Sequence, residues 1–164
     1  MLRVGTVGTS SIMRTIQEAI RLTDGMECRV VYSRTGEQGR AFAAEMGVPE
    51  HCTDYAAMLE RSDLDLIDIA SPNRFHAEQA LAALEHGKHV IVEKPAAVTR
   101  GDVQRLIDAA RANGVYFFEA ITTLFMPQYE ACRLLLPKLG RIEQAHIRHP
   151  PPPTTYRRIR PGLY

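Results

Sequence analysis

Short apolar runs alternate with helix-like segments from the first residue of this 164-residue chain, and this alternation limits the fold more than any other feature. The expected strands are residues 2–7, 27–32, 51–53, 64–70, 88–92 and 115–118. The expected helices are residues 11–22, 37–46, 54–60, 74–85, 100–112 and 127–138. Strands that alternate with helices form right-handed βαβ units with parallel strands. The sequence therefore predicts an α/β protein with a doubly wound parallel sheet in three layers, α/β/α.

The segments LDLIDIA and KHVIVE are almost continuously apolar, as strands are when helices cover both faces of the sheet. Ser10 or Ser11, Asp54 and Thr99 are suited to cap helix starts, and Gly47 is suited to end a helix. Ligands of doubly wound sheets bind beyond the carboxyl ends of the strands. The residues that directly follow each strand are therefore the candidate site residues.

A glycine- and serine-rich turn, GTVGTSSI, joins the first strand to the first helix. Against the dinucleotide-binding motif G-x-G-x-x-G/A, Gly8 holds the first position, whereas Ser10 and Met13 replace the second and third. Such a turn presents backbone N–H groups to a pyrophosphate at the helix start. The candidate phosphate-binding residues are Gly8, Thr9, Ser10, Ser11 and Ile12. A turn of this composition without any ligand is the alternative.

The second strand ends in Tyr32-Ser33-Arg34-Thr35 and lacks the acidic residue that accepts a hydrogen bond from the ribose 2′-hydroxyl of NAD. Ser33 and Arg34 instead supply donors and one positive charge, which suit a 2′-phosphate. NADP is therefore favoured over NAD as the cofactor. A solvated turn with a surface arginine is the alternative.

Two further strand ends carry polar residues. Ser71, Pro72 and Asn73 follow the fourth strand, with His76 three residues later. A surface or capping histidine is the alternative interpretation of His76.

Glu93-Lys94-Pro95 follows the fifth strand. A lysine at this place can donate to a substrate hydroxyl oxygen or move its proton, if burial lowers its pKa. Lys94 is therefore the candidate catalytic residue, and a solvated lysine is the alternative.

The formal net charge of +1 excludes a strong overall field for nucleic acid or acidic membranes. Three arginines in the segment 149–164 are a weak basis for nucleic-acid binding, and no such partner is expected. The widely spaced Cys28, Cys52 and Cys132 form no metal-ligand motif, so no metal is expected. Sparse cysteines, no apolar signal segment and no run of about 20 apolar residues lead us to expect a cytoplasmic protein without a membrane segment.

The composition changes at Pro150, where four prolines precede TTYRRIRPGLY. We expect residues 1–122 to form the sheet domain and residues 123–148 to add a helix and a strand, 141–147. Residues 149–164 are expected to be a disordered Pro/Arg-rich tail. Arginine supplies 17 of the 20 basic residues, which suggests GC-rich coding. A frameshift is therefore one hypothesis for the tail.

Taken in order, GTVGTSSI, VVYSRT, IASPNRFHAEQALAALEHGKHVIVEKP and FFEAITTLFMP resemble the glucose–fructose oxidoreductase, inositol dehydrogenase and rhizopine-catabolism family, called Gfo/Idh/MocA. The resemblance covers residues 1 to about 147, and the segment from Ile69 to Pro95 is its most specific part. It implies a Rossmann domain that binds NAD or NADP, and hydride transfer on sugars, polyols or related carbonyl compounds.

The resemblance also implies roles for single residues. Lys94 matches the lysine near the reacting hydroxyl and the nicotinamide, and Glu93 and Pro95 match its neighbours. The remaining matches line the cofactor: Gly8, Thr9, Ser10, Ile12, Ser33, Arg34, Ser71, Pro72, Asn73, His76 and Glu119.

This sequence departs from the family pattern after the first domain. Family members continue into a second α/β domain with the substrate pocket and an Asp/His element, and no Asp-x-x-x-His follows Lys94 here. We therefore expect a truncated cofactor-binding fragment that is inactive alone and meets a sugar or polyol substrate only if a second domain is present. The alternative is a nucleotide-binding or interaction module without catalysis, which self-associates through the interface exposed by truncation.

Overall fold

The computed structural model describes residues 1–141 and 144. The chain divides into two compact units, Met1–Thr122 and a second unit that begins at Thr123. The predicted strand 141–147 and the tail 149–164 lie outside the described residues, apart from Arg141 and Gln144.

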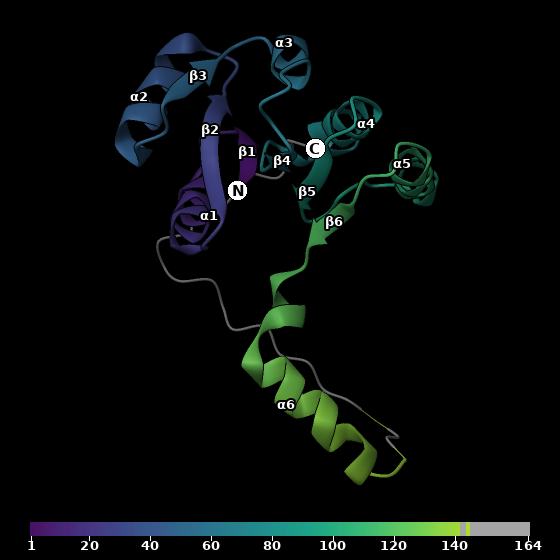
Figure 1. Ribbon diagram of the computed structural model, residues 1–164. Coiled ribbons are helices and arrows are strands. Elements are labelled where there is room, and N and C mark those ends of the chain that lie inside the picture. Colours follow the sequence, from purple (N-terminus) through teal and green to yellow (C-terminus); the bar gives the residue numbers. More distant parts are fainter. Residues whose placement is uncertain (142–143, 145–164) are drawn as a thin grey trace, which may run out of the picture. The chain divides into compact units, whose positions relative to one another are not determined.

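A six-stranded parallel sheet forms the centre of the first unit (Figure 1). Its strands are β1 (Leu2–Val7), β2 (Met26–Tyr32), β3 (Glu50–Cys52), β4 (Leu66–Ile69), β5 (His89–Glu93) and β6 (Phe117–Ala120). Their order across the sheet is β3-β2-β1-β4-β5-β6. The chain thus winds outward in both directions from β1, and the doubly wound fold class predicted from the sequence is confirmed.

Helices cover the sheet between successive strands. They are α1 (Ser11–Leu22), α2 (Gly36–Met46), α3 (Tyr55–Leu59), α4 (His76–Glu85) and α5 (Arg100–Ala112). Helices α1 and α2 pack on one face, where Met13 and Phe42 share a buried cluster with Val31 of β2. Helices α3, α4 and α5 share the large cluster on the opposite face.

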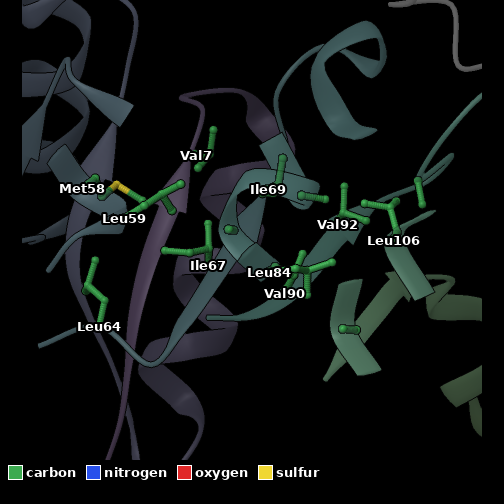
Figure 2. Close-up of a cluster of buried hydrophobic side chains, with 14 of the residues drawn as sticks. Val7, Met58, Leu59, Leu64, Ile67, Ile69, Leu84, Val90, Val92 and Leu106 are labelled. Carbon is green, nitrogen blue, oxygen red and sulfur yellow. The ribbon is translucent and has the colours of Figure 1, made fainter. Parts of the chain in front are cut away.

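The large cluster is the main hydrophobic core. Figure 2 shows side chains of β4 and β5, among them Ile67 and Val90, beside Leu84 of α4. Each of these three side chains is fully buried, and burying one contributes roughly 2 kcal/mol. The apolar sequences of β4 and β5 are therefore explained by burial, and the core fixes the strand ends on which the site is built.

The helix starts follow the predicted capping residues. Ser10 accepts a hydrogen bond from the Met13 amide, Asp54 caps α3 and Thr99 caps α5. Gly47 ends α2 in the left-handed conformation. These polar side chains satisfy N–H groups that have no partner inside the helix.

Several boundaries differ from the expectation. Strand β4 covers Leu66–Ile69 instead of 64–70, and the last α-helix ends at Leu135 instead of residue 138. The segment Asn73–Phe75 forms a 3₁₀ turn, so α4 begins at His76 instead of residue 74. Strand β6 lies at Phe117–Ala120 instead of 115–118, because Phe117 pairs with Val90 of β5. Pairing with the neighbouring strand, which local sequence does not reveal, sets this boundary.

The second unit contains α6 (Pro127–Leu135), followed by a 3₁₀ turn, Leu136–Lys138. Pro127 occupies the first turn of α6, where its missing N–H leaves no hydrogen bond unmade. The exposed apolar side chains of this unit include Leu134, Leu135 and Leu139.

Candidate functional site

The turn after β1 depends on glycine. Gly8 has φ of +115°, and a Cβ atom there would lie 2.8 Å from the carbonyl oxygen of Ala70 at the end of β4. The Gly8 amide donates to the Tyr32 carbonyl at 3.0 Å. Gly8 therefore lets the ends of β1, β2 and β4 approach closely, directly before the start of α1.

Ser10 has the capping role expected for it. Its hydroxyl oxygen accepts from the Met13 amide at 3.4 Å and caps α1. The amides of the following residues, Ser11 and Ile12, lie in the first helical turn, where no carbonyl of α1 can accept from them. They are the groups of this turn that can bind an anion.

A cavity of about 230 Å³ joins the ends of β1, β2 and β4. Seven of the predicted site residues line it: Gly8, Thr9, Ser10, Ser33, Arg34, Ser71 and Pro72. Six further lining residues were not predicted as site residues: Val7, Tyr32, Gln38, Ala70, Phe75 and Gln79. Gln38 follows Arg34 by four residues, and Gln79 follows His76 by three. This helical spacing from predicted site residues is the sequence signal that could have identified both glutamines.

Ser33 and Arg34 occupy different environments at the end of β2. Ser33 is buried, and its amide donates to the Cys52 carbonyl at 3.0 Å. Arg34 is exposed at the cavity edge. No carboxylate among residues 1–141 and 144 forms an ion pair with Arg34, so its guanidinium can meet a ligand anion there.

A second, open depression of about 390 Å³ lies against the ends of β4 and β5. It shares Ser10, Ala70, Ser71 and Pro72 with the first cavity. Its other lining residues are Ile12, Asn73, His76, Glu93 and Lys94. The two cavities together form one crevice, which runs along the carboxyl edge of the sheet from Arg34 to Lys94.

His76 is neither a surface histidine nor a cap, which corrects the alternative interpretation. Its side chain is buried, with Nδ1 2.9 Å from the Pro95 carbonyl oxygen and Nε2 2.7 Å from the Ser71 carbonyl oxygen. His76 therefore ties the turn after β4 to the segment after β5, and both segments belong to the crevice wall.

Lys94 is exposed in this unit, so the burial that the sequence argument invoked for it is not supplied by these residues. Its backbone amide donates to Glu93 Oε2 at 3.3 Å. The Glu119 carboxylate, on β6, accepts from the Ala96 amide at 2.9 Å. Glu119 and Pro95 thus lie outside the crevice lining and hold the segment that carries Lys94, and Ser11 also lies outside the lining.

Asp68 is the least expected group near the site. It lies in β4, and its Oδ1 is buried without a hydrogen-bond partner in the described part of the chain. Burial, and then the negative charge of Glu93, raise the pKa of the Asp68 carboxyl to about 7. The sequence marks Asp68 as an acid in an apolar strand but does not reveal this environment.

The described residues contain no cluster of three or more metal-ligating side chains. None of the helices in the described residues combines the length and the apolar character that crossing a bilayer requires.

A doubly wound parallel sheet with a glycine turn and a crevice across its carboxyl edge defines the Rossmann class of α/β domains. A family profile described as "Oxidoreductase family, NAD-binding Rossmann fold" matches residues 2–121. The chain belongs to this family, Gfo/Idh/MocA, which confirms the resemblance found in the sequence.

Individual relatives agree with this assignment. The chain is 35% identical over 144 residues to scyllo-inositol 2-dehydrogenase (NADP(+)) of Bacillus subtilis. This alignment covers 88% of this chain and 44% of that protein. The chain is also 35% identical over 162 residues to the uncharacterized oxidoreductase YgjR of Escherichia coli, covering 99% of this chain and 49% of YgjR. The chain thus spans about half the length of these relatives. Because the YgjR alignment extends into residues 149–164, it counts against the frameshift hypothesis.

Solved structures give the same result. A 3-ketoreductase from Actinomadura kijaniata, solved with NADP, superposes with a TM-score of 0.79 at 31% identity. The match covers 84% of this chain and 44% of that chain.

Proposed function

We propose that this chain is the cofactor-binding part of an NAD(P)-dependent oxidoreductase that transfers hydride on a sugar, a polyol or a related carbonyl compound. The continuous crevice from Arg34 to Lys94 is the observation that carries the proposal. Two of the similar proteins, an inositol dehydrogenase and a 3-ketoreductase, support this substrate class.

The crevice fits a dinucleotide with a 2′-phosphate. The space beside Gly8, which a Cβ would fill, and the first turn of α1 suit the pyrophosphate. Arg34 suits the 2′-phosphate, because a guanidinium binds phosphate with two parallel hydrogen bonds. NADP is therefore the proposed cofactor in preference to NAD.

The bound cofactor would supply the hydride acceptor or donor. The Lys94 side chain would form a hydrogen bond with the reacting oxygen of the substrate and would accept or donate the proton of that oxygen. Two contacts fix the segment that carries Lys94: His76 bonds to Pro95 and Glu119 bonds to Ala96. These contacts hold the backbone that follows Lys94, and Lys94 lines the depression, which supports the role proposed for it.

The chain by itself would bind cofactor but not turn over substrate at enzyme-like rates. Lys94 is exposed in the described residues, and hydride transfer needs a substrate that is oriented and shielded from water. Formation of reduced nicotinamide from inositol and NADP⁺ by the purified chain, at a kcat above about 1 s⁻¹, would refute this part of the proposal.

Calorimetric titration with NADP⁺ and NAD⁺ tests the cofactor assignment. Arg34→Gln removes the guanidinium at the crevice edge, and Arg40→Gln removes an exposed arginine of α2 that lines neither cavity. We expect Arg34→Gln to weaken NADP⁺ binding about tenfold and to leave NAD⁺ binding unchanged. Equal losses for both cofactors, or an equal effect of Arg40→Gln, would contradict the 2′-phosphate role.

A protein-interaction module without catalysis is the second candidate. It is favoured by three exposed leucines of the second unit, because exposed apolar side chains promote association. These are Leu134, Leu135 and Leu139. Size-exclusion chromatography with light scattering separates the two candidates. A monomer that binds NADP⁺ supports the first, and an oligomer that binds neither cofactor supports the second.

A further inference from the structure

Asp68 lies among polar side chains that are already engaged with one another. It pairs with Thr6 in the β1–β4 register, so both side chains point to the α1 face of the sheet. Gln17 of α1 donates to the Thr6 hydroxyl at 2.9 Å and to the Cys28 sulfur at 3.2 Å. Asp68 Oδ1 has no partner in this cluster or elsewhere in residues 1–141 and 144. A buried carboxyl group in this state favours its protonated form.

Glu93 connects this buried group with the crevice. Asp68 pairs with Ile91 in the β4–β5 register, and Glu93 follows Ile91 by two residues, which places it on the same face of the sheet. Glu93 is half-buried and lines the depression together with Lys94. Asp68 and Glu93 are therefore a carboxyl pair with one member in the interior and one at the crevice. Burial and the negative charge of Glu93 both disfavour ionisation of Asp68.

The groups around the pair differ at its two ends. Lys94 follows Glu93 directly and is exposed beside it, and the buried His76 lines the same depression. On the α1 face, β2 contributes the Cys28 thiol, whose pKa is raised mainly by burial, and the thiol therefore stays neutral. Helix α1 and strand β1 contribute the uncharged Gln17 and Thr6.

We propose that the Asp68–Glu93 pair gives up a proton when an oxidised nicotinamide ring occupies the depression, and keeps it when the ring is reduced. This inference rests on the function proposed above. An oxidised ring carries a positive charge, which stabilises a second carboxylate, so the proton leaves Asp68 for solvent as the cofactor binds. A reduced ring is neutral, and the proton stays in place. Asp68 therefore acts through Glu93 as a positioning residue. Its loss or retention of a proton adjusts the negative charge beside the depression to the redox state of the cofactor.

The coupling has a defined sign and an upper limit. Because the oxidised form expels a proton, its binding strengthens relative to that of the reduced form as the pH rises. Exchange of at most one proton limits the change to tenfold per pH unit. We expect the ratio of the NADPH to the NADP⁺ dissociation constant to increase three- to tenfold between pH 6 and pH 8, an order-of-magnitude value. The 2′-phosphate is present in both forms, so its own titration largely cancels in the ratio.

Calorimetry in two buffers of different ionisation enthalpy tests the proposal, because it counts the protons released on binding. Wild type, Asp68→Asn and the control Asp108→Asn, which changes an exposed carboxylate of α5, are each titrated with NADP⁺ and NADPH. Asp68→Ser is a second neutral variant, which checks that the result does not depend on the asparagine side chain. We expect more protons released with NADP⁺ than with NADPH in wild type and Asp108→Asn, and no such difference in the Asp68 variants.

The outcomes separate the two proposals. An equal difference in wild type and in the Asp68 variants, or no difference in wild type, overturns the inference and leaves the proposed function standing. Failure of wild type to bind either form overturns the proposed function and the inference with it. A pH-dependent dissociation-constant ratio that Asp68→Ser abolishes supports both, since a purely structural role would not change proton release.

Discussion

Replacing Asp68 with asparagine is expected to make the protein more stable, and increasingly so as the pH rises. The folded-state pKa of Asp68 is about 7, whereas an unfolded aspartate has a pKa of about 3.9. The folded protein therefore binds more protons than the unfolded chain between these values. The free energy of unfolding therefore decreases as the pH rises from about 3.9 to about 7. Above pH 7 it is lower by the full amount that corresponds to the pKa difference.

The magnitude follows from the linkage between pKa and stability. About three pKa units at 1.36 kcal/mol each give roughly 4 kcal/mol of destabilisation at pH 8. At pH 5 the same relation gives about 1.5 kcal/mol, so about 2.5 kcal/mol is lost between pH 5 and pH 8. Asp68→Asn cannot ionise, and its advantage over wild type should grow by this amount over the same range.

Urea unfolding of wild type, Asp68→Asn and the control Asp108→Asn at pH 5 and pH 8 measures this change. The control alters an exposed side chain of α5, and its effect should stay within about 0.5 kcal/mol at both pH values. The reasoning is refuted if the stability difference between wild type and Asp68→Asn is the same at pH 5 and at pH 8.

Three further substitutions test other parts of the account. Gly8→Ala should lower stability by about 3 kcal/mol or more and abolish cofactor binding, because it adds a backbone clash to an unfavourable φ. Gly87 also has a positive φ but has open space around the added Cβ, so Gly87→Ala should lower stability by only about 1 kcal/mol and leave binding intact. Thermal unfolding and calorimetry compare the two variants. Arg34→Gln should reduce the preference for NADP⁺ over NAD⁺ about tenfold while Arg40→Gln does not, and unchanged selectivity would remove the 2′-phosphate assignment. Tyr55→Phe deletes the 2.8 Å hydrogen bond from the half-buried Tyr55 hydroxyl to the Gln79 backbone carbonyl of α4. Urea unfolding should therefore show a loss of about 1 kcal/mol in the free energy of unfolding, and no loss would mean that this contact does not hold α4.

The fold was predictable from the sequence because several local signals agree. Apolar runs of strand length, helical spacing between them, and capping residues such as Ser10, Asp54 and Thr99 all indicate the same βαβ order. The boundary of β6 was not predictable, since pairing with β5 sets it. Local propensity carries no information about such a partner.

The candidate site was predictable as a set of strand ends but not in its side-chain environments. The rule that ligands bind at the carboxyl edge led to Gly8, Arg34 and Lys94, and the structure places all three along one crevice. Neither the burial of His76 between two carbonyl oxygens nor the exposure of Lys94 follows from residue type. Both depend on how the segments after β4 and β5 pack together, which is a long-range property.

Calorimetric titration of the purified chain with NADP⁺ tests the central claim most directly, since the claim is that the crevice from Arg34 to Lys94 binds a dinucleotide. The account predicts saturable binding at one site per chain, tighter for NADP⁺ than for NAD⁺, and a matching rise in the thermal unfolding midpoint. Binding of neither cofactor, with the chain folded by circular dichroism, would contradict it.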